Sequence, residues 1–536
     1  MGAAPRRPLR AALPHADPGR QEDSRVVTSM AERGRITHMV ISPHVNVMNA
    51  VGDKATHREE PLVCEHRVER YGDEYDVLVV GAGFAGLAAA IEACNTGASV
   101  LVLEKMRAPG GNSTISDGGI AAAGTPMQER EGITDSPELM YSDMLRAGLG
   151  LNHPALVREL ARRSAETLQW SVDYLGVEYL DRLDQFGGHS VPRCFTAANV
   201  SGATIIKRQV AKLRELGVEI RLRTCLKGFV RDARGKVSGV SVREGFEPRQ
   251  PEAGVDRCVR ATRGVVLATG GFGADIAFRS AQDPRLGASV DTTNVRFATA
   301  EALIEGLRIG AMPVHLSHIQ LGPWASPDEK GYGVGPRFGD YVAFQYGLVV
   351  SPDTSARIVN ELADRKTVAD AILAVGKPCV GIADSKAVQE SGWSIDRCLQ
   401  KGVVRSFDSL ADLAAFYGLH TEALAATVER FSDFVSRKRD NDFGKPILDG
   451  AAPVTHPPYY GMRLWPKVHH TMGGVQIDVE GRVINLDGNP IPGLYAAGEV
   501  TGGVHGACRL GSCAITECLV FGRIAGRSAA TALRKS

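Results

Sequence analysis

The order of apolar and polar residues indicates that strands and helices alternate after about residue 72. Residues 76–80 (DVLVV) form a short continuous apolar run, as expected for a strand that is buried on both faces. A helical stretch at 85–97 and a second apolar run at 99–105 follow it. This strand–turn–helix–strand unit predicts the start of a doubly wound α/β sheet. Further strands are predicted at 217–224, 237–242 and 263–271.

The middle of the chain breaks this alternation, which predicts how the domains are arranged. Residues 316–467 are less regular and carry several aromatic residues and helical segments. We therefore expect an inserted α+β capping domain at 316–467, between two parts of a Rossmann-like nucleotide-binding domain at 72–315 and 468–536. Residues 1–71 are rich in Arg, Ala and Pro without a periodic apolar face, so we expect a disordered extension there.

A glycine-rich turn directly after the first predicted strand is typical of dinucleotide binding. Gly81, Gly83 and Gly86 satisfy the GxGxxG pattern at the point where the first helix begins. Such a turn lets the backbone approach a pyrophosphate, which the helix N-terminus then binds. Glu104 ends the next strand, where an acidic side chain can accept a hydrogen bond from a ribose 2′-hydroxyl.

Further glycine-rich segments indicate which dinucleotide is bound. Residues 109–113 (PGGNS) and 117–120 (DGGI) follow the second strand, and 491–500 (IPGLYAAGEV) lies near the other end of the chain. Segments so distant in sequence suit a long cofactor that lies extended across the sheet. With these segments the sequence resembles the FAD-dependent fumarate reductase and succinate dehydrogenase flavoprotein family, from about residue 75 to residue 530.

This resemblance implies FAD as the cofactor, in a doubly wound FAD-binding domain with an inserted capping domain. The family's membrane-complex members attach FAD covalently through a His in the segment after the GG pair. Here that segment is 112–115 (NSTI), without His, so we expect non-covalent FAD. The chain is more similar to the soluble flavocytochrome-c-type fumarate reductases and to urocanate reductases, although it lacks haem motifs.

The family's flavin contacts carry over onto positions in both parts of the expected FAD domain. By resemblance, the cofactor-binding residues are Gly81, Gly83, Ala85, Gly86, Glu104, Lys105, Gly111, Asn112, Ser113, Gly118, Gly119, Val230, Gly270, Glu301, His470, Glu499, Ala514 and Ile515. No residue is expected to bind a metal.

Three segments match the family's catalytic motifs in the expected order. They are 357–365 (RIVNELADR), 469–474 (HHTMGG) and 502–511 (GGVHGACRLG). The resemblance implies that Arg365 donates a proton and that His469 and Arg509 bind the substrate carboxylate. The substrate-binding residues expected from it are Gly119, Trp324, His469, Arg509 and Ser512.

These residue types suit the reduction of a carbon–carbon double bond conjugated to a carboxylate. The reaction needs a hydride at one carbon, which reduced flavin supplies from N5, and a proton at the next. Charge builds toward the carboxylate, so a forked Arg and a His donor stabilise the transition state more than the ground state. Because the pKa of arginine lies above about 12, a carboxylate must return its proton, and Asp340, Glu361 and Asp364 are the candidates.

The sequence departs from the fumarate reductases where they bind a second carboxylate. Gly322 stands at the position of a His, Trp324 replaces a Thr, and 299–302 (TAEA) replaces TGDG. The Glu-x-x-Arg pair that relays protons in the family is also missing. Fumarate carries two carboxylates, so the loss of one clamp argues against it unless His318 or His315 takes its place.

An aromatic wall at Trp324, with Tyr332 or Tyr341, suits a flat or apolar substituent instead. Urocanate and arylacrylates fit that description, and Asp340 would then pair with an imidazole N–H. Ordinary packing within the capping domain explains Trp324 equally well. Fumarate, urocanate and other acrylates therefore all stay open as substrates.

Two other classes of function are alternatives to a reductase of unsaturated carboxylates. One is a flavin dehydrogenase that acts in the opposite direction, on a 3-ketosteroid or a tricarballylate-like acid. Ketosteroid dehydrogenases rely on Tyr residues to polarise a ketone and abstract a proton, whereas Arg365, His469 and Arg509 point to a carboxylate. The other is a flavin-binding protein without turnover, in which these three residues would have no use.

Composition narrows the partners and the compartment. The 62 Lys and Arg balance 61 Asp and Glu, so neither nucleic acid nor an anionic membrane is expected as a partner. No apolar run of about 18 residues exists, so we expect no membrane span. The ten Cys form no CxxC pattern, and we expect reduced thiols in the cytoplasm. The electron donor stays open between a separate flavin reductase, a quinone and NAD(P)H.

Overall fold

The main sheet of the protein matches the predicted doubly wound pattern. The structure, a computed structural model, describes residues 71–532, so the predicted extension lies outside the described residues except for Tyr71. Eight strands follow the order β17–β18–β8–β1–β2–β5, with β7 on β8 and β6 on β7. They are β1 (Asp73–Val80), β2 (Val100–Leu103), β5 (Glu219–Arg221), β6 (Thr224–Arg231), β7 (Val237–Glu244), β8 (Val255–Leu267), β17 (Arg482–Ile484) and β18 (Pro490–Ala496). Strand β1 pairs in parallel with both β2 and β8.

Two glycines allow the first strand, turn and helix to pack closely. Strand β1 ends at Val80, and α1 (Phe84–Asn95) begins directly after the turn. Gly81 has a φ of +104°, and a Cβ there would lie 2.3 Å from the carbonyl oxygen of Ala268. A Cβ on Gly86 would lie 1.9 Å from the carbonyl oxygen of Gly81. Only glycine fits at these two positions, which explains the spacing of the sequence motif.

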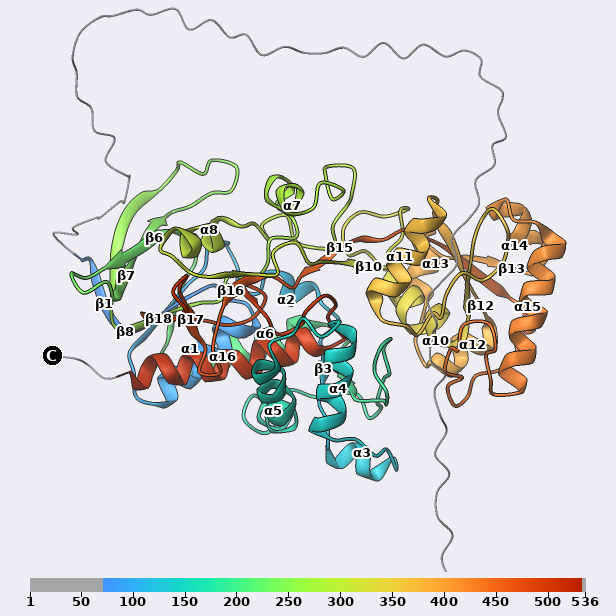
Figure 1. Cartoon of the computed structure of the whole chain (residues 1–536), viewed down its shortest axis with the longest axis horizontal. Helices are drawn as coiled ribbons and strands as arrows, with labels where there is room; N and C mark the ends of the chain where they lie inside the picture. Colours follow the sequence, from blue (N-terminus) through green and yellow to red (C-terminus); the bar gives the residue numbers. More distant parts are fainter. Residues whose placement is uncertain (1–70, 533–536) are drawn as a thin grey trace, which may run out of the picture. The chain divides into compact units, whose positions relative to one another are not determined.

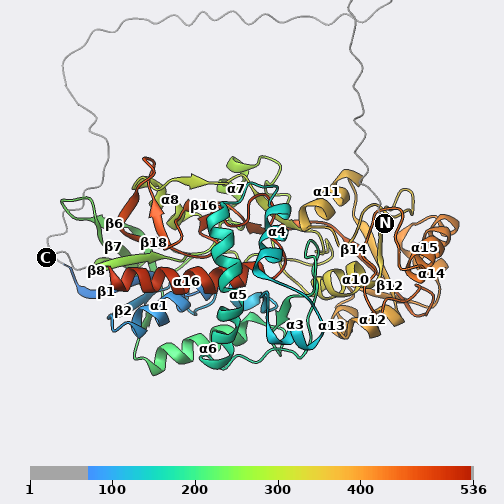
Figure 2. The ribbon, with the colours of Figure 1, turned by 60° about the horizontal axis from the view of Figure 1, so that its bottom comes forward.

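Helix α16 (Cys513–Thr531) packs along α1, as Figures 1 and 2 show. A Cβ on Gly522 would lie 2.5 Å from the carbonyl oxygen of Ala85, and one on Gly526 would lie 2.1 Å from that of Ala89. Small residues therefore bring the two helix backbones together. Because α16 begins at Cys513, this contact also positions the segment just before it, which carries predicted site residues.

The remaining elements of the predicted FAD-binding parts are short strands and helices around the main sheet. The helices are α2 (Asn112–Ile115), α3 (Pro126–Arg130), α4 (Pro137–Ala147), α5 (Pro154–Asp173), α6 (Gly202–Glu215), α7 (Ile276–Gln282) and α8 (Glu301–Arg308). Two small sheets pair β3 (Gly119–Ala121) with β4 (Cys194–Thr196), and β16 (Gly474–Gln476) with β9 (Pro313–Val314) and β19 (Thr501–Gly502).

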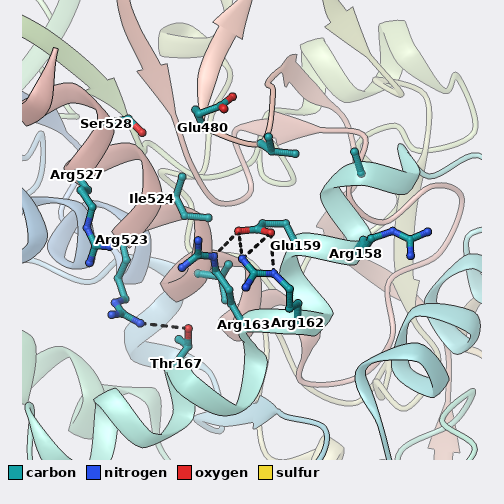
Figure 3. A pocket seen from close by; sticks show the side chains of 13 residues that line it. Arg158, Glu159, Arg162, Arg163, Thr167, Glu480, Arg523, Ile524, Arg527 and Ser528 are labelled. Atoms are coloured by element: carbon teal, nitrogen blue, oxygen red, sulfur yellow. Dashed lines mark hydrogen bonds and ion pairs between the residues drawn. The ribbon is translucent and has the colours of Figure 1, made fainter. Parts of the chain in front are cut away.

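A surface pocket of about 510 Å³ lies beside α5 and α16 (Figure 3). Its lining combines apolar side chains with five arginines. Most of these arginines are already paired: Arg162 lies 2.9 Å from Glu159, and Arg523 lies 2.7 Å from Glu92. The first pair lies within α5, the second connects α16 with α1, and none of the predicted site residues lines the pocket.

A second, antiparallel sheet lies within the predicted capping domain. Its order is β11–β12–β14–β13, with β11 (Leu348–Val350), β12 (Cys379–Asp384), β13 (Arg405–Phe407) and β14 (Tyr459–Leu464). The helices of this region are α9 (Gly335–Phe338), the π-helix η1 (Gly339–Ala343), α10 (Phe344–Tyr346), α11 (Arg365–Val375), α12 (Ser385–Ser391), α13 (Asp396–Gln400), α14 (Leu410–Tyr417) and α15 (Thr421–Ser436). The protein is thus an α/β fold with an α+β cap.

Strands β10 (Ile319–Gly322) and β15 (Lys467–Thr471) lie at the two predicted boundaries of the cap and pair with each other. Their antiparallel register places Gln320 opposite His470. The predicted strand 263–271 differs from the observed β8, which begins at Val255 and ends at Leu267, because the residues after Leu267 leave the sheet to contact the glycine-rich turn. Over residues 71–532, no helix has the length and apolar character needed to cross a membrane.

Candidate active site

The Glu104 carboxylate lies at the glycine-rich turn, where the sequence predicts a ribose. Its Oε2 accepts a hydrogen bond from the Ala82 N–H at 2.9 Å, and its Oε1 accepts one from the Met106 N–H at 2.8 Å. A carboxylate has about four acceptor positions, so lone pairs are left for a ribose hydroxyl. The turn and the first turn of α1 hold the predicted residues Gly81, Gly83, Ala85 and Gly86.

Ser113 and Asn112 lie close to the N-terminal end of α1. Ser113 Oγ accepts a hydrogen bond from the Phe84 N–H at 3.1 Å. Asn112 Nδ2 donates to Asn294 Oδ1 at 2.6 Å, and Asn294 Nδ2 donates to the carbonyl oxygen of His469 at 3.1 Å. A helix N-terminus attracts phosphate. Two amide side chains therefore connect the expected pyrophosphate position with the expected catalytic strand.

Gly119 and Ser512 bring β3 to the beginning of α16. A Cβ on Gly119 would lie 2.6 Å from Ser512 Oγ, so a side chain at position 119 would displace Ser512. Ala514 and Ile515 follow in the first turn of α16, and Gly118 precedes Gly119 with a φ of +76°. The structure thus brings together the two segments where the sequence predicts flavin contacts.

His470 and Glu499 form a buried pair at the same end of the site. His470 Nδ1 lies 3.4 Å from Glu499 Oε1, which also accepts from the Thr471 N–H at 2.9 Å. Burial raises the pKa of Glu499 to about 7, and burial together with Arg509 holds the pKa of His470 well below its usual value. Among the described residues, His470 Nε2 has no hydrogen-bond partner, which fits a contact with a flavin.

The other predicted cofactor residues lie at the ribose side or in the sheet. Lys105 forms an ion pair with Glu301, and both line a pocket of about 330 Å³. Val230 is buried in β6. A Cβ on Gly111 or Gly270 would meet nothing within 4 Å, so open space adjoins both positions. The donor set, the open glycines and the unpartnered His470 nitrogen together fit FAD.

His469 and Arg509 are suited to bind a carboxylate. His469 Nδ1 lies 2.8 Å from Thr293 Oγ1, and Arg509 Nη1 donates to the carbonyl oxygen of Leu510 at 2.8 Å. Burial, followed by the charges of Arg509 and Arg365, holds the pKa of His469 well below its usual value, so the imidazole is neutral. Burial and then Arg365 lower the pKa of Arg509 to about 10, so its guanidinium keeps its charge at neutral pH.

Arg365 begins helix α11 directly after the N-cap Asp364, and its side chain reaches Asp340 of the π-helix. The distance from Arg365 Nη2 to Asp340 Oδ2 is 3.1 Å, with side-chain exposures of 12% and 11%. Burial raises the pKa of Asp340 to about 6, against the opposing effect of Arg365. Burial disfavours the charge of Arg365, but Asp340 and then Asp117 outweigh it and raise the pKa of Arg365.

The structure distinguishes the three carboxylates that the sequence offers as partners of Arg365. Glu361 lies 2.7 Å from Arg357, in a separate buried ion pair. Asp364 accepts a hydrogen bond from the Lys366 N–H at 3.0 Å and caps α11. Asp340 is the candidate in contact with the Arg365 guanidinium.

Trp324 forms a wall that connects the carboxylate-binding residues with Arg365. Its ring packs edge-to-face on His469 at 4.9 Å and on Tyr332 at 5.6 Å between centroids, and it is 2% exposed. The Arg365 guanidinium lies 5.7 Å from the centre of the indole. A Cβ on Gly322 would lie 3.0 Å from this indole, so the glycine leaves the room that Trp324 occupies.

The rings of the two histidines that the sequence offers as a replacement clamp pack against each other. The rings of His315 and His318 lie 5.4 Å apart, and His153 lies 5.9 Å from His315. Among the described contacts, none joins either ring to His469 or Arg509. A role for His315 or His318 as a replacement clamp stays a prediction.

Comparison with known proteins gives the family. The family described as an FAD binding domain matches residues 76–515. The acrylate reductase flavoprotein subunit of Shewanella woodyi is 44% identical over 469 residues, which cover 85% of this chain and 92% of the relative. The chain belongs to the FAD-dependent fumarate reductase family.

Two further members of the family match this flavoprotein over most of its chain. The fumarate reductase (cytochrome) of Shewanella frigidimarina is 35% identical over 90% of this chain and 83% of the relative. The open conformation of a flavocytochrome c3 fumarate reductase superposes with a TM-score of 0.67 and 33% identity, covering 86% of this chain and 78% of that one. The predicted family, fold and FAD cofactor are confirmed, and this flavoprotein is an oxidoreductase acting on CH–CH groups. Non-covalent attachment of FAD stays a prediction.

Sequence reasoning missed two residues of the flavoprotein's site. Asp117, directly before the GG pair, accepts a hydrogen bond from the Tyr341 hydroxyl, and Thr293 contacts His469. The sequence shows an acidic residue directly before Gly118, but it does not indicate that this residue, Asp117, contacts Tyr341, which lies 224 residues away. The threonine carried no signal, since its partner is fixed only by the pairing of distant segments.

Proposed function

We propose that this flavoprotein reduces acrylate or a similarly small unsaturated monocarboxylate. The broader reaction follows from its family, because the chain is an FAD-dependent reductase of unsaturated carboxylates. The observation that carries the narrower proposal is the buried Trp324, which fills the space beside His469 and packs against Gly322. A substrate bound by one carboxylate then has little room for a second substituent.

In this proposal His469 and Arg509 bind the carboxylate and orient the double bond. When bound, FAD supplies the hydride from N5 of its reduced ring. A Thr293 hydroxyl that donates to His469 Nδ1 leaves the hydrogen on Nε2, which can donate to the substrate. The charged Arg509 stabilises the negative charge that develops on the carboxylate as the hydride arrives. A neutral donor and a cation thus act on the same group.

Arg365 is the proposed proton donor, and Asp340 is proposed to return its proton. A guanidinium gives up a proton only if a partner restores it at once, because the pKa of arginine is far above neutral pH. Asp340 contacts Arg365 at 3.1 Å, and its pKa of about 6 lets it carry a proton near neutral pH. The burial of both groups keeps this exchange away from bulk water.

Steady-state assays with a reduced viologen as electron donor test the substrate. We expect turnover with acrylate, weaker turnover with methacrylate, and little with fumarate, urocanate or cinnamate. Protein that lost its FAD provides the control. Preference for fumarate over acrylate would contradict the proposal.

The dehydrogenase alternative requires a tyrosine that acts as a base. Tyr332 and Tyr341 lie in the site, but burial first, and then neighbouring carboxylates, hold the pKa of both hydroxyls well above the usual value. The Tyr341 hydroxyl also donates its hydrogen to Asp117. These properties favour the reductase.

The electron donor and the compartment follow as further proposals. A flavin reductase, a quinol or NAD(P)H can each be supplied to the protein with acrylate, and the donor is the one that sustains turnover. We propose a reducing, cytoplasmic setting because the nine described cysteines are all free. Localisation of a tagged full-length chain tests this directly.

A further inference from the structure

Asp117 places a carboxylate next to the residues expected to meet flavin and substrate. It lies between α2 and β3, and its Oδ1 accepts a hydrogen bond from the Gly119 N–H at 3.3 Å. A Cβ on Gly119 would lie 3.6 Å from Asp117 Oδ1 and 2.6 Å from Ser512 Oγ. The carboxylate therefore borders the space between β3 and the beginning of α16.

Tyr341 holds the Asp117 carboxylate from the capping side. Its hydroxyl donates to Asp117 Oδ2, and its ring packs edge-to-face on Phe186 at 5.1 Å and on Trp393 at 4.7 Å. Tyr341 is 2% exposed. Because this aromatic contact fixes the tyrosine, Asp117 cannot swing away from the site without losing a buried hydrogen bond.

Asp117 acts on the Arg365–Asp340 pair. After burial and the Arg365 charge, Asp117 is the next influence on Asp340, whose pKa it raises. After burial and Asp340, it is also the next influence on Arg365. Asp340 directly precedes Tyr341, the hydrogen-bond partner of Asp117, in the π-helix η1, so Asp117 lies close to the Arg365–Asp340 pair.

The charges of the arginines and aspartates in the candidate site can balance a single substrate carboxylate. Arg365 and Arg509 contribute two positive charges, and Asp340 and Asp117 contribute two carboxylates. The carboxylate-binding His469 is neutral, because burial and the two arginines lower its pKa. One substrate carboxylate is compensated when Asp340 takes up a proton, whereas a second carboxylate would add a further negative charge to these groups.

We propose that Asp117 is a specificity-determining residue that excludes dicarboxylates from the active site. The inference rests on the proposed function and adds a charge to the steric effect of Trp324. Like charges brought together in a desolvated site cost several kcal/mol in general. Fumarate would place its second carboxylate near Asp117 and Asp340, but acrylate has only hydrogens there.

The test substitutes Asp117→Asn, which removes the charge and keeps an oxygen that can accept from Tyr341. We expect the ratio of kcat/KM for fumarate to that for acrylate to rise about tenfold or more. Asp370→Asn is the matched control, since it removes the charge of an exposed carboxylate that pairs with Lys366 on α11, and its ratio should stay close to that of the unchanged protein. A ratio that does not change in Asp117→Asn would overturn the inference.

Ligand binding separates this inference from the proposed function. Calorimetry on FAD-loaded protein gives the dissociation constants of propionate and succinate, which need no turnover. Asp117→Asn should strengthen succinate binding relative to propionate, and equal changes for both acids would overturn the role of Asp117. If the unchanged protein does not reduce acrylate, the proposed function is contradicted. The binding measurement still tests the role of Asp117 in that case, because it needs no turnover. Equal FAD content in all variants excludes a folding defect as the cause.

Discussion

Arg365 and Asp340 form a buried ion pair with 3.1 Å between Nη2 and Oδ2. The arginine begins α11, and the aspartate lies in a π-helix, a form that often occurs at functional sites. The sequence offered three carboxylates for this arginine, and the other two make different contacts. The pair defines where a proton would be held before it reaches a substrate.

Arg365→Ala should abolish reduction of acrylate while FAD stays bound. General acid catalysis contributes about 10²–10⁴-fold, so kcat should fall by about that factor. Lys366→Ala is the matched control, because Lys366 is half exposed and pairs with Asp370 on the same helix. The measurement is kcat together with the visible flavin spectrum. Unchanged turnover in Arg365→Ala would rule out this proton donor.

Asp340→Asn should lower kcat about 100-fold or more without weakening acrylate binding, since Arg365 loses the group that restores its proton. Asp364→Asn is a suitable control. Asn is as good an N-cap as Asp, and Asp364 caps α11 without contacting the Arg365 guanidinium. Single-turnover and steady-state rates, compared in both variants, test the role. Equal losses in the two variants would contradict it.

The pH dependence of kcat should report on Asp340. Burial raises its pKa to about 6, so above that pH the fraction of Asp340 that holds a proton decreases about tenfold per pH unit. We therefore expect kcat to fall as pH rises through this range. The decline should be absent in Asp340→Asn. A profile that rises with pH over the same interval would exclude Asp340 as the proton carrier.

Trp324→Ala should widen the substrate range. Removing the indole opens space beside His469, so kcat/KM for methacrylate and cinnamate should rise relative to acrylate by about tenfold. Trp465→Phe provides a control, because Trp465 is a partly buried tryptophan of the cap that packs against the same apolar cluster as Trp324. If the relative rates stay the same, the indole does not limit the substrate.

Gly86→Ala should prevent FAD binding. Its Cβ would lie 1.9 Å from the carbonyl oxygen of Gly81, so the turn that receives the pyrophosphate cannot keep its shape. Gly287→Ala is the control, because a Cβ there meets nothing within 4 Å. FAD content per chain after purification measures the effect. Full FAD content in Gly86→Ala would contradict the assignment of this turn.

Local patterns predicted the nucleotide-binding half of the fold. The apolar run at 76–80, the glycine spacing and Glu104 depend on residues near one another in sequence, and β1, α1 and β2 follow them closely. The long strand β8 was predicted only in its second half. Its first residues, Val255 to Arg257, are exposed and do not alternate between apolar and polar side chains. Their sequence pattern therefore does not predict the pairing with β7.

The residues of the candidate site could be predicted from the sequence only where they lie in motifs that match the family. Arg365, His469 and Arg509 were predicted by resemblance, and the structure places Arg365 and His469 against Trp324, with Arg509 acting on the pKa of His469. The bond between Tyr341 and Asp117 was not predictable, because it joins segments 224 residues apart. The choice of Asp340 over Glu361 and Asp364 also required three-dimensional contacts.

Reoxidation of the reduced flavin tests the central claim most directly. The purified protein is reduced with dithionite without oxygen and then mixed rapidly with acrylate, fumarate or propionate while the visible flavin absorbance is followed. The proposed function predicts fast return of the oxidised spectrum with acrylate, slow return with fumarate and none with propionate. If acrylate leaves the flavin reduced while fumarate reoxidises it rapidly, the protein is not a reductase of small monocarboxylates.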